Sequence, residues 1–209
     1  GISTATNTVS TPNTYTVTAT DPSNGCTATT STTVTQNITP PNLSIAPPAQ
    51  LTCTNTNTTL TASSTTAGAT FNWGGGNTTA TNTVSAPNTY SVTATDPGNG
   101  CTATASITVI QNITPPNVSI APPAPLTCTT TSTTLTASST TAGATFNWGG
   151  GITTATNTVS TPNTYSVTAT DPGNGCTATA SITVTQNITP PNVSIAPPAQ
   201  LTCTTSSTV

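Results

Sequence analysis

Apolar and hydroxyl-bearing residues alternate with a period of two along most of this 209-residue chain, a pattern typical of half-buried β-strands. In the segment Asn88–Thr95, Tyr90, Val92 and Ala94 fall on one face, while serine and threonine occupy the other. Asp96-Pro97-Gly98-Asn99-Gly100 then predicts a tight turn, because proline presets φ and Asn-Gly tolerates positive φ. The alternation resumes directly afterwards, so the two segments together predict a β-hairpin.

The same pattern predicts seven short strands in one stretch of the chain. They are expected at residues 42–45, 50–53, 58–63, 69–73, 81–85, 88–95 and 101–109. Seven short strands with turns at this spacing are typical of an immunoglobulin-like sandwich. The expected fold class is therefore all-β, with immunoglobulin-like β-sandwich domains of about seven strands each.

This stretch of strands recurs along the chain. Cys26, Cys101 and Cys176 are separated by 75 residues (101 − 26 and 176 − 101), and the text around them repeats with the same period. A unit of this length suits a complete small domain better than one turn of a solenoid. We expect head-to-tail domains at 39–113 and 114–188, with the C-terminal part of a repeat at 1–38 and the N-terminal part of another at 189–209. A Pro-Pro linker at 111–117 is expected to act as a semi-rigid spacer.

Charge is almost absent from the chain, which has no Lys, Arg or His and a net charge of −3. Without cations the chain cannot neutralise phosphates, so nucleic acid and anionic lipid are not expected as partners. No apolar run reaches the length of a membrane span, so no membrane insertion is expected. One carboxylate per repeat and no histidine cannot supply an acid and a base, so we expect no catalytic residue and no enzyme activity. No cofactor is expected either, since the glycine runs precede no lysine.

The three acidic residues, Asp21, Asp96 and Asp171, occupy the same place in successive repeats. A calcium site in an extracellular module needs several oxygen ligands, usually with more than one carboxylate. The Asp side chain before Pro-x-Asn-Gly is expected instead to accept a hydrogen bond within the turn. No metal site is predicted.

The six cysteines predict disulfides and an oxidising, extracellular compartment, because no histidine or close cysteine pair offers a metal or redox site. Translational symmetry leaves two simple patterns, pairing within a repeat or pairing across the linker. Loop entropy separates them by only about 0.5 kcal/mol. Pairing across the linker is disfavoured, because a whole strand and the linker would place the two Cα atoms beyond the separation of about 4.4–6.8 Å that a disulfide spans. We therefore favour Cys53–Cys101 and Cys128–Cys176 as structural bonds, with Cys26 and Cys203 paired to cysteines outside this sequence.

Three other features have alternative interpretations. Phe71, Trp73 and Tyr90 would suit a carbohydrate-binding platform if exposed, but their period-two spacing favours core positions. The Thr-x-Thr pattern would suit an ice-binding surface if flat, but sandwich strands twist. Asn112 and Asn117 begin glycosylation sequons.

Several segments of one repeat resemble a known group of proteins. These are Leu126-Thr127-Cys128, Thr134–Ser138, Phe146-Asn147-Trp148, Asn163–Asp171 and Asn174–Ala178. They look like the immunoglobulin-like repeats of large secreted surface proteins in Bacteroidota-type bacteria. The resemblance implies a bacterial extracellular or cell-surface location, and a role as an adhesin or filament.

Two structural roles follow for such a chain. Its repeats could form the stalk of a cell-surface adhesin, whose adhesion target the sequence does not identify. Alternatively they could form an extracellular filament in which copies of the chain contact one another. The missing charge favours self-association, because edge strands are normally guarded by lysine and net charge keeps neighbouring molecules apart.

Overall fold

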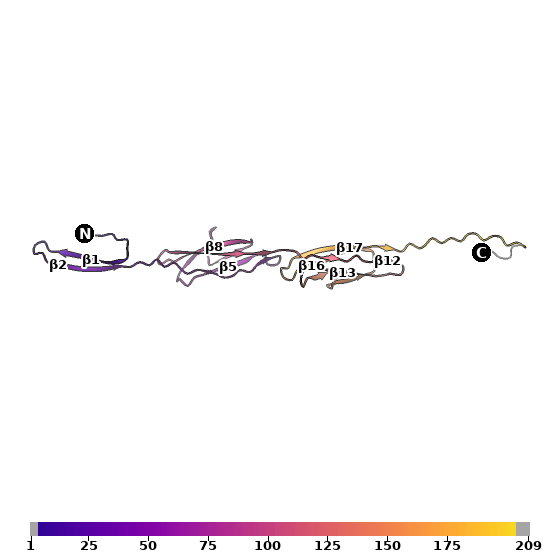
Figure 1. Cartoon of the computed structure of the whole chain (residues 1–209), viewed down its shortest axis with the longest axis horizontal. Helices are drawn as coiled ribbons and strands as arrows, with labels where there is room; N and C mark the ends of the chain where they lie inside the picture. The colour runs from indigo at the N-terminus through magenta and orange to yellow at the C-terminus, as the bar shows by residue number, and fades with distance from the viewer. Residues whose placement is uncertain (1–3, 204–209) are drawn as a thin grey trace. The chain divides into compact units, whose positions relative to one another are not determined.

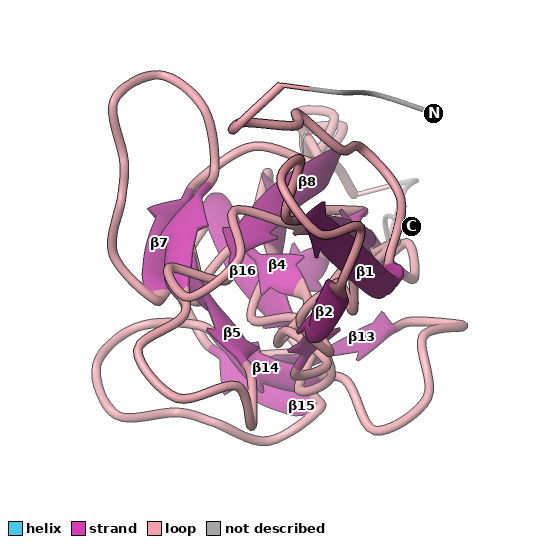
Figure 2. Ribbon diagram, turned by 90° about the vertical axis from the view of Figure 1, so that its left-hand side faces the viewer, coloured by secondary structure: helices cyan, strands magenta, loops and turns pink. Residues whose placement is uncertain are grey.

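The computed structural model describes residues 4–203, and these residues form β-strands connected by turns and loops (Figure 2). Nearly all strand pairs are antiparallel. Within this described range no helix is long and apolar enough to cross a membrane. The expectation of an all-β chain is confirmed.

The chain divides into two compact units. The first comprises Gly1–Leu51 and Asn55–Gln111, and the second comprises Thr52–Thr54 and Asn112–Val209. Thr52–Thr54 is therefore part of the second unit by its contacts, although in the sequence it lies within the repeat expected at 39–113. The predicted boundaries at 38, 113 and 188 stay predictions.

The first unit contains the hairpin β1–β2 and most of one repeat (Figure 1). The repeat forms two three-stranded sheets, with strand orders β3-β5-β7 and β6-β8-β9, and a short pair β4-β10. The strands are β1 (Asn13–Thr20), β2 (Thr27–Val34), β3 (Ser44–Ile45), β4 (Leu51–Thr52), β5 (Thr58–Ser63), β6 (Thr70–Asn72), β7 (Thr81–Val84), β8 (Asn88–Thr95), β9 (Thr102–Val109) and β10 (Gln111–Asn112).

The second unit repeats this arrangement. Its sheets have the orders β11-β13-β15 and β14-β16-β17, and its short pair β12-β18 is parallel, joining Leu126 to Gln186 and Thr127 to Asn187. The strands are β11 (Ser119–Ile120), β12 (Leu126–Thr127), β13 (Thr133–Ser138), β14 (Thr145–Asn147), β15 (Thr156–Val159), β16 (Asn163–Thr170), β17 (Thr177–Val184) and β18 (Gln186–Asn187).

The alternation in the sequence sets which side chains are buried. In β8, Val92 and Ala94 are fully buried while Ser91 is exposed. Each unit has a small core that draws residues from both three-stranded sheets and from the short pair. The two cores are Leu51, Leu60, Val84 and Val109 in the first unit, and Leu126, Leu135, Val159 and Val184 in the second.

The hairpin β1–β2 has the same register as β8–β9 but a different environment. Val17 is 60% exposed, whereas Val92 at the equivalent position is 0% exposed. The two strands β1 and β2 therefore pair although Val17 between them is exposed. The alternating pattern and the Asp-Pro turn are sufficient to define this hairpin.

One difference from the sequence prediction concerns the linker. Gln111 and Asn112 were predicted as part of the Pro-Pro spacer, but they form β10 and pair with β4. The physical reason is that Leu51 donates its backbone N–H to the carbonyl of Ile110 at 3.0 Å, which extends the sheet past Val109. The spacer is correspondingly shorter than expected.

Candidate functional site

The most distinctive chemical feature of the chain is a disulfide between Cys53 and Cys176. Their Cα atoms are 5.1 Å apart, and the two residues are separated by 123 positions in the sequence. Cys101 and Cys128 are free, as are Cys26 and Cys203. The predicted bonds Cys53–Cys101 and Cys128–Cys176 are therefore wrong: a cysteine of the 39–113 repeat joins one of the 114–188 repeat. That Cys26 and Cys203 have partners outside this sequence stays a prediction.

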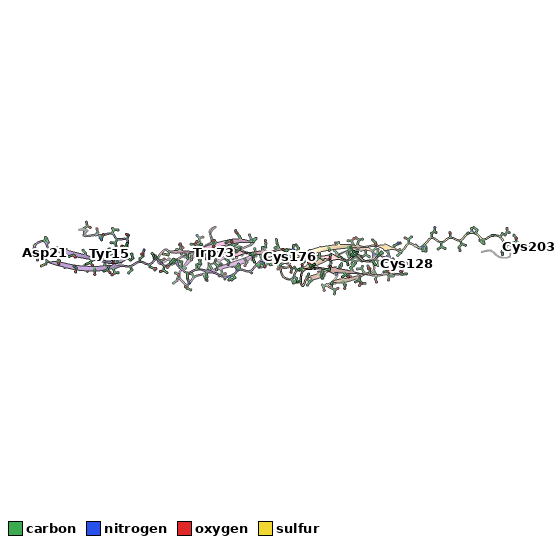
Figure 3. The ribbon with its side chains drawn as sticks, in the orientation of Figure 1. Tyr15, Asp21, Trp73, Cys128, Cys176 and Cys203 are labelled. Carbon is green, nitrogen blue, oxygen red and sulfur yellow. A yellow bond between two sulfur atoms is a disulfide. The ribbon has the colours of Figure 1, made fainter. Side chains whose placement is uncertain are left out.

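The parallel pairing of β12 with β18 explains why the predicted pairing fails. Cys128 directly follows β12, so it lies at the far end of β18, and its thiol is 3.9 Å from the carbonyl of Ile188. Cys176 directly precedes β17, at the other end of the long hairpin. The eleven steps along the chain from Cys176 to Asn187 rise roughly 35 Å when extended. A disulfide needs Cα atoms within about 7 Å, and Figure 3 shows Cys128 and Cys176 well apart.

The turn that carries Cys176 is held by its own aspartate. Asp171 accepts a hydrogen bond from the backbone N–H of Gly173 through Oδ1 at 2.8 Å, and from Gly175 through its carbonyl at 2.8 Å. The backbone of Asp171 also donates to the carbonyl of Cys176 at 2.9 Å. The prediction that this aspartate serves the turn is confirmed. Gly175 has a φ of 69°, which a side chain at that position would strain.

Asn174 connects this turn to the linker before its own repeat. Its Nδ2 donates to the carbonyl of Thr114 at 2.9 Å and to Oδ1 of Asn112 at 3.2 Å. Its Oδ1 accepts from the backbone N–H of Cys176 at 2.9 Å, and its carbonyl accepts from the N–H of Cys53 at 3.1 Å. The asparagine therefore places Cys176 directly beside Cys53.

The first unit contains the same turn without the disulfide. Asn99 Nδ2 donates to the carbonyl of Thr39 at 2.9 Å, which is the contact that Asn174 makes with Thr114 one repeat later. Asn99 also accepts from the N–H of Cys101 through Oδ1 at 2.8 Å. The contact between turn and linker is thus a property of the repeat, and it does not depend on the disulfide.

Burial differs between the two equivalent turns. Asn174 is 2% exposed and Cys176 is 1% exposed, whereas Asn99 and Cys101 are only half-buried. A Cβ atom added to Gly175 would meet the side chain of Thr54, while one added to Gly100 would meet no atom of residues 4–203 within 4 Å. The segment Thr52–Thr54 therefore covers the turn at 171–176, whereas the turn at 96–101 has no such contact among the described residues. We call the contact of these two segments the junction.

Paired hydroxyl groups occupy the exposed face of each long hairpin. Across β8 and β9, hydroxyl oxygens lie 3.0 Å apart in Thr89–Thr108, 3.1 Å in Ser91–Ser106 and 3.3 Å in Thr93–Thr104. The same pairs recur across β16 and β17. Cross-strand hydroxyl pairs of this kind stabilise a sheet. The hydroxyl groups on this face therefore bond partly to one another, and the face carries no charge.

The tryptophans and two of the tyrosines pack against the cores: Trp73 and Tyr90 in the first unit, and Trp148 and Tyr165 in the second. Trp73 Nε1 donates to the carbonyl of Thr79 at 3.2 Å, and the Tyr90 hydroxyl donates to the carbonyl of Ala86 at 3.0 Å. Phe71 is half-buried in β6. The core interpretation agrees with the structure for Trp73 and Tyr90, whereas for Phe71 it stays a prediction.

The other candidate polar residues have local partners. Asn117 Oδ1 accepts hydrogen bonds from the hydroxyl of Ser139 at 3.0 Å and from the N–H of Thr140 at 2.9 Å. In the first turn the hydroxyl and backbone N–H of Ser23 bind Asp21, and they lower the pKa of this carboxyl below its ordinary value. Over residues 4–203, no three His, Cys, Asp or Glu side chains gather as a metal site would require.

No protein-family model matches this chain, and no curated protein matches it. Among solved structures, the chain is similar to one described as three N-terminal domains of the bacteriophage RB49 Highly Immunogenic Outer Capsid protein (Hoc). The sequence identity is 18% and the TM-score is 0.41. The match covers 70% of this chain and 59% of the phage chain.

Proposed function

We propose that this chain is a non-enzymatic structural repeat region of a secreted bacterial extracellular filament or cell-surface adhesin stalk. The observation that carries the proposal is the disulfide between Cys53 and Cys176. Cys53 and Cys176 belong to successive 75-residue periods of the sequence, although both lie in the second compact unit. The bond therefore links one period of the sequence covalently to the next, which supports a continuous array.

Three features support an immunoglobulin-like sandwich for each repeat. The two three-stranded sheets contribute to one core. A short strand pairs in parallel with the extension of the last strand, as β12 does with β18. The Tyr90 hydroxyl bonds back to the carbonyl of Ala86, four residues upstream, as in the tyrosine corner of immunoglobulin-like domains. Tyr15 and Tyr165 make the equivalent bonds to Thr11 and Thr161.

An extracellular location fits the chemistry of the junction. Structural disulfides persist in oxidising compartments and are rare in the cytosol. The bond here closes a sequence of 123 residues, and the turn that carries Cys176 is almost completely covered. A cell-surface or secreted location would keep this bond oxidised.

Self-association is supported by the character of the exposed surface. The hydroxyl pairs on the long hairpins present an uncharged face, and the whole chain has only three ionised side chains. Charge repulsion between copies is therefore weak, and contacts between them would depend little on salt. This favours a filament over a stalk that stands free of its neighbours.

Light scattering and negative-stain electron microscopy of the purified, oxidised chain test this proposal. Ordered fibres whose yield changes little between low and high salt would support the filament. Monomers at every concentration and salt would exclude it and leave the stalk. Specific binding to a glycan panel, or inhibition of ice recrystallisation, would contradict a purely structural role. The bonded ends of Trp73 and Tyr90 and the paired hydroxyls give no support to either activity.

A further inference from the structure

We propose that the disulfide between Cys53 and Cys176 is a mechanical bypass, which carries pulling force past the folded residues between them and fixes the extended length of the chain. The inference rests on the proposed function, because only a filament or stalk is pulled along its length. The covalent connection on which it depends is independent of that function. Reduction of the bond would add the residues between Cys53 and Cys176 to the length over which the chain can be extended.

The force path follows from the covalent connectivity. Tension applied to the two ends reaches Cys53 from one side, crosses the two sulfur atoms and leaves through Cys176 on the other side. The strands from β5 to β16 all lie in the loop between the two cysteines. They contain the buried positions Leu60, Val84, Leu135 and Val159, which belong to the cores of both units. Tension therefore cannot stretch these strands while the bond is intact.

The strands outside the loop respond differently. β17 begins directly after Cys176, and β4 ends directly before Cys53, so both remain in the force path. Pulling can separate β17 from β16 without lengthening the loop. The hydrogen bonds of Asn174 to Thr114 and to the N–H of Cys53 hold the two ends of the bypass together, next to the bond.

The junction also limits access to the bond. Thiol–disulfide exchange requires a thiolate to reach one of the two sulfurs. Cys176 is 1% exposed, whereas Cys53 is an exposed residue. Attack is therefore expected at the Cys53 sulfur, with Cys176 leaving as the thiolate. The covering segment Thr52–Thr54 thus protects one half of the bypass.

Formation of the bond is a balanced two-electron oxidation. The two thiols lose two protons and two electrons, and a disulfide oxidant such as oxidised glutathione accepts them and becomes two thiols. Opening by dithiothreitol is the reverse exchange, in which the reagent is oxidised to its cyclic disulfide. The mechanical state of the chain consequently follows the thiol–disulfide balance of its surroundings.

The change in length is large enough to measure in a single molecule. A stretched chain spans at most about 3.3–3.6 Å per residue. The 123 positions between the two cysteines therefore correspond to roughly 40 nm of hidden length. Pairing within a repeat, over 48 positions from Cys53 to Cys101, would hide only about 16 nm.

Single-molecule force spectroscopy on the full chain, with handles ligated to its two termini, tests the bypass. The Cys128→Ser variant retains Cys53 and Cys176, and it should gain about 40 nm of contour length when dithiothreitol is added. The Cys53→Ser variant should show the full contour length with or without the reagent. Unmodified chain provides the comparison if either variant folds poorly, and it should gain the same 40 nm.

Three results would overturn the proposal. A gain of about 16 nm in Cys128→Ser would show that Cys53 pairs with Cys101, and no gain would show that the bond does not form. A reductant-dependent gain in Cys53→Ser would show that a disulfide without Cys53 closes a loop in the chain. These measurements use isolated chains, so they can refute the bypass even if the chain assembles into fibres. Likewise, a chain that forms no fibres can still show the gain of about 40 nm.

Discussion

Replacing Asn174 by alanine is expected to destabilise the second unit more than replacing Asn99 destabilises the first. The two asparagines occupy identical turns, so the local sequence is the same. Asn174 makes three side-chain hydrogen bonds and is 2% exposed. Asn99 makes two side-chain hydrogen bonds and is only half-buried. The comparison removes the effect of the turn sequence and leaves two differences, the burial of Asn174 at the junction and its additional hydrogen bond to Asn112.

The expected magnitudes follow from which groups are left without partners. Asn174→Ala removes the acceptor of the buried Cys176 N–H, and an unsatisfied buried group costs about 1–3 kcal/mol in addition to ordinary bonds of about 0.5–1.5 kcal/mol each. We expect a loss of about 3 kcal/mol. In Asn99→Ala, water can replace part of the lost hydrogen bonding, so we expect a loss of about 1 kcal/mol.

The two tryptophans make this comparison measurable, because each unit contains one. Trp73 packs against the first core and Trp148 against the second. Urea unfolding of oxidised protein, followed by fluorescence in Trp73→Phe and Trp148→Phe backgrounds, reports one unit at a time. Equal losses for the two alanine variants would refute the reasoning, because they would show that covering the turn adds nothing to its stability.

Three further outcomes are expected. Gly175→Ala should slow reoxidation of the Cys53–Cys176 bond by oxidised glutathione, because the new methyl group meets the side chain of Thr54. Gly100→Ala should lower the stability of its unit by only about 1–2 kcal/mol, because of its positive φ. Equal reoxidation rates in the two variants would contradict this. By NMR titration the pKa of Asp21 should lie below its ordinary value and should rise in Ser23→Gly, because the hydroxyl and N–H of Ser23 bind the carboxylate. The contribution of this carboxylate to the hairpin should be present above the ordinary pKa of an aspartate and be lost as pH falls through the lowered pKa. An unchanged titration would exclude the Ser23 hydroxyl as the cause. Trypsin should leave even the denatured chain uncut, since it contains no Lys or Arg, as mass spectrometry would show.

The strands were predictable from the sequence because their determinants are local. The alternation in 88–95 and 102–109 and the turn at Asp96 define β8 and β9 within one or two residues. The pairing of Cys53 was not predictable in this way. In a periodic sequence, every separation between the two kinds of cysteine satisfies translational symmetry, and we considered only the two shortest ones.

The missing information was the parallel pairing of a two-residue strand. Leu126 and Thr127 carry no alternating pattern long enough to indicate a partner, so the sequence could not show that Cys128 lies at the far end of β18. The one available signal was the Gln-Asn pair at 111–112 and again at 186–187. This recurring pair is the extension of the last long strand of each repeat, as β10 and β18 show.

The length of the disulfide loop relative to the repeat has a consequence for longer arrays. The loop spans 123 positions, whereas the repeat spans 75 (176 − 101), so the same pairing applied to successive copies gives loops that overlap. Each loop then ends inside the next, and the loops fall into two alternating series. Each series alone connects the array from end to end. Along one series, a disulfide alternates with 27 residues of backbone, such as those from Cys101 to Cys128, and there is one disulfide per two repeats. Opening any single bond would therefore leave the other series intact, and the array would keep its length.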